Sequence, residues 1–235
     1  NEDTIRWAIV FSYLAPIAIF IPYMMRSEAP NSPVRLRELV GLLHTGIPWQ
    51  ISRFMQILMQ KIDVIVVLAF VGSTAAGIYS VGLSLAMLCT IIAAQYSNNA
   101  LHQAFSGNST RREMDSLYAA LSGLILGVGL VAVGSPAITL LFGPEFSHAY
   151  LIMIACLPGA IAYGVIQVQT NYIRILGSWQ SLAVTSSIGL SVMLLGLILF
   201  VARLGAVGAG LAFSAGAVTS AICGAFVLRS IPRPQ

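Results

Sequence analysis

Apolar residues divide the chain into seven long hydrophobic stretches, each near the length of about 20 residues that a helix needs to cross a bilayer. A lipid-exposed segment must satisfy its own backbone hydrogen bonds, and these stretches are longer and more continuous than the strands of a membrane barrel. The pattern therefore predicts an all-α fold, a polytopic membrane helix bundle of about seven transmembrane helices. We expect the spans at residues 5–23, 46–71, 77–104, 117–142, 147–173, 180–202 and 207–228.

The segments between the spans indicate how the helices are connected. Residues 27–45 combine a proline-containing linker with a short amphipathic helix, which we expect to lie at the membrane surface. Pro48 then marks either a bend or the true start of the second span. The connections at 72–76 and 203–206 are short, so each predicts an antiparallel hairpin.

Composition places the chain among integral membrane proteins. Of its 235 residues, 57% are hydrophobic and 9% are charged, whereas a soluble domain carries about 25% charged residues. Its mean hydropathy is +0.87. The three cysteines lie far apart within apolar runs, without the spacing of a metal site or a disulfide framework. Because the chain begins at Asn1 rather than at a methionine, we expect it to be part of a longer protein.

The arginines give the bundle an orientation. If the linker at 27–45 is cytoplasmic, eight arginines fall on the cytoplasmic side and only Arg6 and Arg203 on the other side. Positive charge is enriched in the cytoplasmic loops of membrane proteins. We therefore expect the C-terminus to lie in the cytoplasm.

The second expected span carries a polar stripe. Arg53, Gln56, Gln60 and Asp63 fall within an arc of about 80° on one helical face. Ionisable groups at this depth are costly, so they normally face a bundle interior or a water-filled cavity. Arg53 and Asp63 are about 15 Å apart along the axis, so each requires a partner on another helix, in water or in a substrate.

Two other expected spans, the third and the fifth, repeat this pattern. Each places four polar residues on one face with i, i+3, i+4, i+7 spacing, at depths that overlap with the stripe of the second span. The sets are Gln95, Asn98, Asn99 and His102 in the third span and Gln167, Thr170, Asn171 and Arg174 in the fifth. These three spans should therefore surround a polar cavity, with the fourth span against lipid or apolar protein. The alternative for each carboxamide is a structural hydrogen bond between helices. The residues expected to line the cavity are Arg53, Gln56, Gln60, Asp63, Gln95, Asn98, His102, Gln167, Asn171 and Arg174.

Enzyme chemistry is not indicated by the sequence. It contains no glycine-rich phosphate loop, no His/Cys cluster with metal-ligand spacing and no nucleophile–His–carboxylate set. We therefore expect no catalytic residue, no metal, no cofactor and no nucleic-acid partner.

Three stretches resemble the second half of the polysaccharide and O-antigen flippases, which belong to the superfamily of multidrug, oligosaccharidyl-lipid and polysaccharide exporters. Residues 61–80 place Asp63 near the middle of a helix, before a short turn and a Gly-x-Tyr-Ser start. Residues 141–146 are similar to the family's Phe-Gly-x-x-aromatic turn, and 204–212 to its Gly/Ala run in the penultimate loop. The resemblance covers most of the chain from about residue 36 onward.

The resemblance implies two bundles of six helices that face each other around a cationic cavity in the bacterial cytoplasmic (inner) membrane. The substrate would be a lipid-linked oligosaccharide on an undecaprenyl-pyrophosphate-type carrier, destined for O-antigen, lipopolysaccharide or another polysaccharide. This chain would supply the last transmembrane helix of the first lobe (1–26), the cytoplasmic linker and amphipathic helix (27–45) and the six-helix second lobe (46–235). The rest of the first lobe would lie outside the chain.

The function expected from these observations is that of a flippase working by alternating access. Arg53 and Arg174 would attract the pyrophosphate or acidic sugars, and the carboxamides would bind sugar hydroxyls. Asp63 would pair with a cation of the other lobe or respond to a coupling-ion gradient. Further partners would be membrane lipids and the polymerase or export machinery. The alternatives are a drug/toxin:cation antiporter of the same superfamily, a membrane enzyme of envelope biosynthesis and a purely structural subunit.

Overall fold

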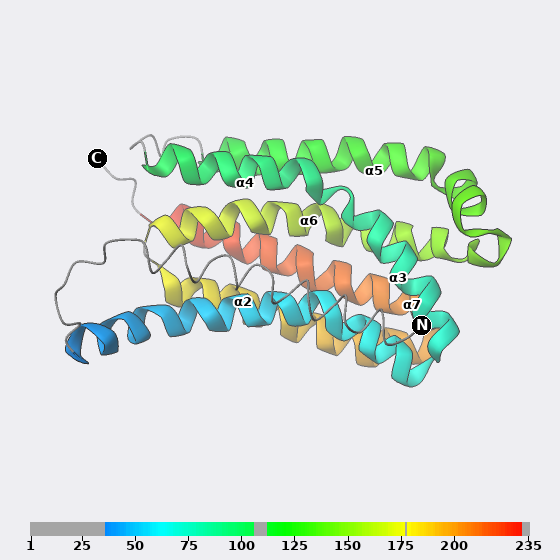
Figure 1. Cartoon of the computed structure of the whole chain (residues 1–235), viewed down its shortest axis with the longest axis horizontal. Coiled ribbons are helices and arrows are strands. Elements are labelled where there is room, and N and C mark those ends of the chain that lie inside the picture. The colour runs from blue at the N-terminus through cyan, green and yellow to red at the C-terminus, as the bar shows by residue number, and fades with distance from the viewer. Residues whose placement is uncertain (1–35, 106–111, 177, 232–235) are drawn as a thin grey trace, which may run out of the picture. The chain divides into compact units, whose positions relative to one another are not determined.

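Helices make up all the regular structure of the residues that this computed structural model describes, namely 36–105, 112–176 and 178–231. The predicted all-α fold is thus confirmed, while the expected first span lies outside the described residues. Residues 43–235 form one compact unit. In chain order the elements are α2 (Leu36–Phe70), α3 (Ser73–Met87), α4 (Thr90–Phe105), α5 (Arg112–Phe142), the 3₁₀ turn η2 (Pro144–Phe146), α6 (Ala149–Ile175) and α7 (Trp179–Ser230) (Figure 1).

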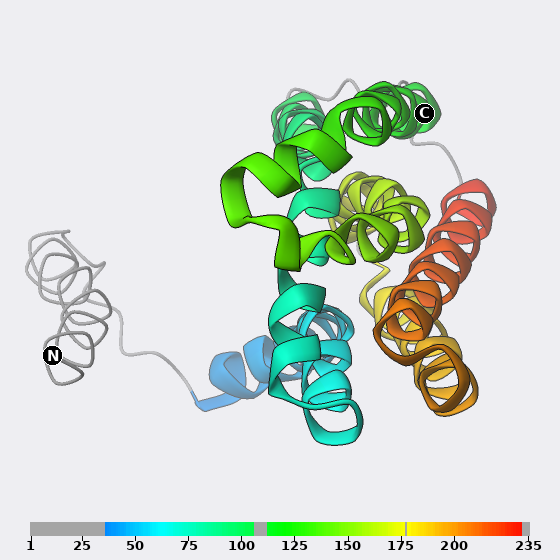
Figure 2. The ribbon, with the colours of Figure 1, turned by 90° about the vertical axis from the view of Figure 1, so that its right-hand side faces the viewer.

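The central helix of this unit is α6. It packs against α3, α4, α5 and α7, which lie around it in Figures 1 and 2. In its most apolar stretch 67% of the residues are buried inside the bundle, against 17% for α5. Burial on this scale makes α6 the core of the unit. α5 presents its apolar side chains outward, which agrees with the lipid-facing position expected for the fourth span.

α7 consists of two arms, residues 179–204 and 206–230, that meet at Gly205. Gly205 has φ 57° and ψ −134°, which lies outside the helical region and breaks the helix. A positive φ is accessible to glycine at little cost because glycine has no Cβ. The sixth and seventh expected spans are therefore the two arms of α7.

The two arms pack closely and run antiparallel. A Cβ added at Gly208 would lie 2.3 Å from the carbonyl oxygen of Phe200, and one at Gly196 would lie 3.0 Å from the Cβ of Ala212. Contact of 200 with 208 and of 196 with 212 is the pattern of a hairpin centred near Gly205. The hairpin predicted from the short 203–206 connection is confirmed.

The sequence predicted that the third span would be one continuous helix, but the structure differs. The span is divided into α3 and α4, which are bent by 46°. At the break the N–H of Cys89 donates to the carbonyl of Ala86, and the Thr90 hydroxyl donates to the carbonyl oxygen of Met87 at 2.7 Å. Side-chain hydroxyls that bind backbone carbonyls often bend helices. The prediction of a continuous span is therefore wrong at this position.

α2 joins two elements that the sequence predicted to be separate. It runs without interruption through the expected amphipathic helix and the expected second span, with Pro48 inside it. The fixed φ of proline is compatible with a helix, and proline removes only one backbone donor. Pro48 therefore does not mark the start of a helix.

Three of the described helices, α5, α6 and α7, are long and apolar enough to cross a membrane, and bent α3 and α4 form a fourth such span if they are counted together. The apolar stretch of α7, Gln180–Ser230, contains 51 residues, enough for both of its arms. The apolar sequence of α2 is interrupted by the charged residues Arg53, Lys61 and Asp63. These helices form an all-α membrane bundle.

Candidate functional site

A polar pocket lies where α2, α4 and α6 come together. It encloses about 390 Å³, and every side chain that lines it carries a hydrogen-bonding group. The sequence predicted that the polar faces of these three spans would meet, and the structure brings them together here. The lining consists of Ser52, Arg53 and Gln56 from α2, Asn98 from α4, and Thr170, Asn171 and Arg174 from α6.

Helical spacing sets the order of side chains along each wall. On α2, Ser52 and Gln56 are i, i+4 neighbours and both are buried, whereas Arg53 beside them is exposed. On α6, Asn171 and Arg174 lie three residues apart and so share one face. On the α2 wall, a buried hydroxyl and a buried carboxamide thus lie beside an exposed guanidinium group.

Hydrogen bonds between helices hold these walls in place. The Gln56 Nε2 donates to the Thr170 hydroxyl at 3.3 Å, which joins α2 to α6. The Asn171 Nδ2 donates to the Ser97 hydroxyl at 2.6 Å and to its carbonyl oxygen at 3.0 Å, which joins α6 to α4. The Ser52 and Ser186 hydroxyls are 3.0 Å apart and join α2 to α7. Gln56 and Asn171 therefore fulfil the structural role that the sequence left open for carboxamides.

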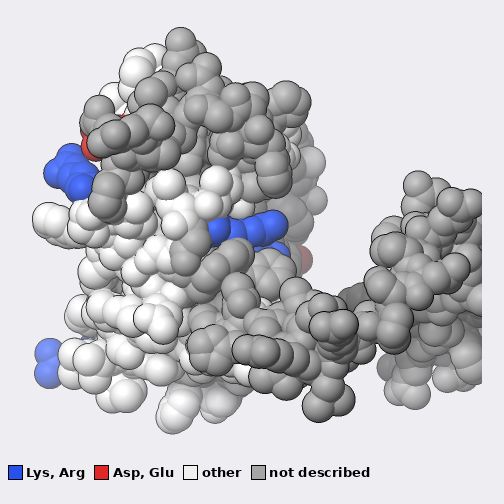
Figure 3. Space-filling view, turned by 90° about the vertical axis from the view of Figure 1, so that its left-hand side faces the viewer, with Lys and Arg blue, Asp and Glu red and all other residues white. Residues whose placement is uncertain are grey.

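The charge of the pocket is positive. Arg53 and Arg174 both line it, and none of its described lining residues is acidic. Arg174 lies in the last turn of α6, where a cation also interacts favourably with the helix dipole. Figure 3 views the end of the molecule where α6 ends, and Lys and Arg side chains lie near the middle of that face. Two guanidinium groups in a water-accessible pocket are suited to an anion, which they can bind through paired N–H donors.

Asp63, at the far end of the stripe, does not line this pocket. Its side chain is fully buried, and the Tyr79 hydroxyl of α3 donates to its Oδ2 at 2.6 Å. The N–H of Val64 donates to its Oδ1 at 2.8 Å. The sequence predicted a partner on another helix, in water or in a substrate, and the structure provides the Tyr79 hydroxyl of another helix, α3.

The remaining predicted residues lie outside the pocket or outside the described side chains. Gln60 is half-buried on α2, near Tyr163 of α6. Gln95 is exposed on α4, and Gln167 contributes its backbone carbonyl, which accepts from the Ser97 hydroxyl at 3.1 Å. His102 belongs to α4, but its side chain is not among those described.

The sequence did not predict Ser52, Ser97 or Tyr79 at the site, and it placed Thr170 on the polar face of the fifth span without including it among the cavity residues. Thr170 shares the helical face of Asn171, and Ser52 precedes Gln56 by one turn, so their spacing was a usable signal. Ser97 and Tyr79 had no such signal, because their roles depend on which helix lies opposite.

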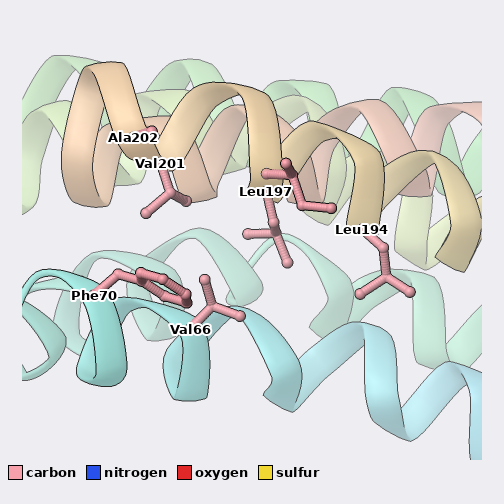
Figure 4. A pocket seen from close by; sticks show the side chains of 7 residues that line it. Val66, Phe70, Leu194, Leu197, Val201 and Ala202 are labelled. Carbon is pink, nitrogen blue, oxygen red and sulfur yellow. The ribbon is translucent and has the colours of Figure 1, made fainter.

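A second pocket on α2 has the opposite character. It encloses about 370 Å³ between the last turns of α2 and the first arm of α7, and all its lining residues are apolar. Figure 4 shows Val66 and Phe70 of α2 facing Leu197 and Val201 of α7 across this space. α2 therefore borders a polar pocket in its middle and an apolar one at its C-terminal end.

No group of three or more His, Cys, Asp or Glu side chains that could hold a metal ion occurs within the described residues. The two buried carboxylates among them, Asp63 and Asp115, each accept a hydrogen bond from a tyrosine, Tyr79 and Tyr172 respectively. The described lining of the polar pocket offers two guanidinium groups together with carboxamides and hydroxyls, which supply positive charge and hydrogen-bond donors and acceptors.

Comparison with known proteins gives one match. A family model described as polysaccharide biosynthesis protein matches residues 5–151, more than half of the chain. The matched range includes α2, with its part of the polar pocket, and α3, α4 and α5. No curated protein and no solved structure matches the chain.

Proposed function

The chain belongs to the family of polysaccharide biosynthesis proteins, and from this premise we propose that it is part of a flippase for lipid-linked oligosaccharides. Such a protein moves the oligosaccharide and its lipid carrier across the membrane, and the pocket between α2, α4 and α6 would be this chain's half of the transport cavity. The family assignment and the multi-pass helical fold support this proposal. The substrate would be attached to an undecaprenyl-pyrophosphate-type carrier.

The observation that carries the proposal is the presence of both Arg53 and Arg174 in a pocket whose described lining includes no acidic residue. A pyrophosphate presents the planar sets of oxygens that guanidinium groups bind through two parallel hydrogen bonds. Exposure of Arg53 keeps it hydrated until an anion arrives. The first contact of the substrate with this chain would therefore be through its phosphates or acidic sugars.

The uncharged lining suits the sugars. Asn98 is exposed, and its carboxamide offers a donor and an acceptor at once. Thr170 and Ser52 add hydroxyls that both donate and accept. A site built this way binds many arrangements of sugar hydroxyls, while Gln56 and Asn171, which are bonded to other helices, keep its walls in place.

Alternating access would turn the cavity from one side of the membrane to the other. We propose that the protein lies in the bacterial inner membrane with its C-terminus in the cytoplasm, so that Arg53 and Arg174 receive substrate from the cytoplasmic leaflet. The facing half of the cavity would belong to a first lobe. A coupling ion and the polymerase or export machinery are further proposed partners, in O-antigen, lipopolysaccharide or another polysaccharide pathway.

The alternatives are less well supported. A drug/toxin antiporter favours acidic and aromatic cavity residues, and the described pocket has neither. An envelope-biosynthesis enzyme needs a catalytic cluster at one interface, and the buried carboxylates Asp63 and Asp115 are far apart in sequence and bonded to tyrosines. We propose that the protein is not an enzyme.

The proposal is tested by removing both guanidinium groups from the full-length protein, in cells that need it for a surface polysaccharide. We expect Arg53→Gln with Arg174→Gln to lower surface polysaccharide by about tenfold or more, because each charge-assisted contact contributes about 1.5–3 kcal/mol. Lysine at both positions should restore part of the surface polysaccharide, since lysine keeps the charge without the bidentate geometry.

The matched control is Arg203→Gln, which removes an exposed arginine beside the Gly205 turn of α7. Its surface polysaccharide and the membrane levels of all variants should equal those of the wild type. Wild-type polysaccharide in the double glutamine variant would show that these arginines do not bind the transported substrate.

A further inference from the structure

A third pocket lies against a different face of α6. It encloses about 450 Å³ between α5, α6 and the second arm of α7, and most of its lining is apolar. Four polar side chains change its character: Glu113 and Ser116 near the start of α5, Arg229 in the last turn of α7, and Gln169 on α6. Neither the predicted transport cavity nor the resemblance to flippases involves these residues.

Gln169 is buried but has no partner. Its side chain is 4% exposed, and no residue that the structure describes forms a hydrogen bond with it. Every fully enclosed side-chain nitrogen or oxygen of the described residues has a hydrogen-bond partner. Because the Gln169 carboxamide has none, it is not fully enclosed by protein. The carboxamide therefore reaches the open space of the pocket, where it can bind a ligand atom.

Gly224 makes this position of Gln169 possible. A Cβ added at Gly224 would lie 2.3 Å from the Gln169 Oε1, closer than any side chain tolerates. The second arm of α7 therefore lacks a side chain where the carboxamide lies. The carboxamide thus fits against α7 within a pocket whose lining is mostly apolar.

The two charges at the pocket are of opposite sign and do not pair with each other. Glu113 and Arg229 are both exposed and both line the pocket, yet no ion pair joins them in the described structure. Each lies at the helix end that favours its sign, Glu113 at an N-terminus and Arg229 at a C-terminus. A ligand that carries a cation and an anion a few bonds apart would complement both.

The depth of the groups matches the layers of a membrane lipid. Glu113 and Arg229 lie at helix ends, whereas Gln169 lies six residues, or about 9 Å, before the end of α6 at Ile175. The rim also carries Leu117 and Ile222, which are 56% and 53% exposed and suit acyl chains. Charges at the helix ends, with an amide and apolar surface further in, match a headgroup above the glycerol esters and acyl chains of a lipid.

We propose that this pocket binds a phospholipid with a zwitterionic ammonium–phosphate headgroup, as in phosphatidylethanolamine. Arg229 binds the phosphate, Glu113 binds the ammonium group, and the Gln169 carboxamide donates to a glycerol ester oxygen. The acyl chains lie along the apolar rim formed by α5 and α7. This lipid is a resident of the helix bundle and is distinct from the substrate of the polar pocket.

The test is a lipid titration of the purified full-length protein in detergent, followed by native mass spectrometry. The probes are phosphatidylethanolamine and phosphatidylglycerol with identical acyl chains, since only the former carries an ammonium group. The variants are Glu113→Gln, Arg229→Gln and Gln169→Leu, with Arg203→Gln as the control for loss of an exposed arginine beside the Gly205 turn, away from this pocket. Thermal unfolding without added lipid checks that each variant is folded.

We expect the wild type and Arg203→Gln to prefer phosphatidylethanolamine. Arg229→Gln should weaken binding of both lipids by about fivefold or more, and Glu113→Gln should weaken phosphatidylethanolamine to a similar extent while sparing phosphatidylglycerol. Gln169→Leu should weaken both lipids, because both contain the glycerol esters. Equal binding of the two lipids by the wild type, or equal effects of Glu113→Gln on both, would overturn the proposal. So would unchanged binding in Arg229→Gln.

Discussion

The two halves of the polar stripe on α2 end in opposite surroundings. Arg53 and Gln56 border a pocket with a polar lining, and Arg53 is exposed there. Asp63, ten residues further on the same face, is fully buried against Tyr79. One continuous helical face thus contributes a binding surface at one end and a structural contact at the other.

The difference comes from the neighbours of α2 rather than from α2 itself. Around Gln56 the opposite helix is α6, which presents Thr170 and the other polar residues of the pocket. Around Asp63 the opposite helix is α3, which presents Tyr79. Nearer the C-terminal end of α2, the side chains of the first arm of α7 that line the second pocket are apolar (Figure 4). Substitutions along the stripe should therefore change stability most at Asp63 and transport most at Arg53.

The largest expected effect on stability comes from Tyr79→Phe. It removes the hydroxyl that donates to the Asp63 Oδ2 and leaves the side chain of Asp63 buried without that donor. Such a loss costs about 1–3 kcal/mol, and we expect the free energy of unfolding in detergent to fall by that amount. Denaturant titration of the purified protein measures it.

Tyr118→Phe is the matched control for this prediction. Tyr118 is 42% exposed on α5, so removal of its hydroxyl should change the free energy of unfolding by less than about 0.5 kcal/mol. Equal stability of Tyr79→Phe and the wild type would mean that the Asp63 contact does not hold α2 to α3.

An intermediate effect is expected for Gln56→Leu. The substitution removes the bond to Thr170, and hydrogen bonds between membrane helices average about 0.6 kcal/mol, with a maximum near about 1.7 kcal/mol. Gln95→Leu removes a carboxamide from an exposed position on α4 and should have a smaller effect in the same unfolding experiment. If Gln95→Leu destabilised the protein more than Gln56→Leu, the structural role of Gln56 would be wrong.

Helical periodicity predicted which residues of α2 share a face, and the pairing of short turns with glycine predicted the hairpin of α7. The break between α3 and α4 was not predictable in this way, because no proline or glycine marks it and it depends on the Thr90 hydroxyl binding the Met87 carbonyl. The burial of Asp63 also could not be predicted from helical periodicity. A single helix shows which side chains lie together, but the contribution of Tyr79 follows only from how α3 packs against α2.

The smallest effect on stability should come from Arg53→Gln, although we propose that Arg53 is the residue of the stripe that matters most for transport. Its side chain is exposed at the pocket, so its removal should change the free energy of unfolding by less than about 0.5 kcal/mol. Transport of the oligosaccharide in cells should fall nonetheless, whereas Tyr79→Phe should lower transport only in proportion to the loss of folded protein. Unfolding curves and membrane protein levels, measured beside surface polysaccharide, separate the two. If Arg53→Gln destabilised the protein as much as Tyr79→Phe does, both halves of the stripe would be structural, and the contrast between them would not hold.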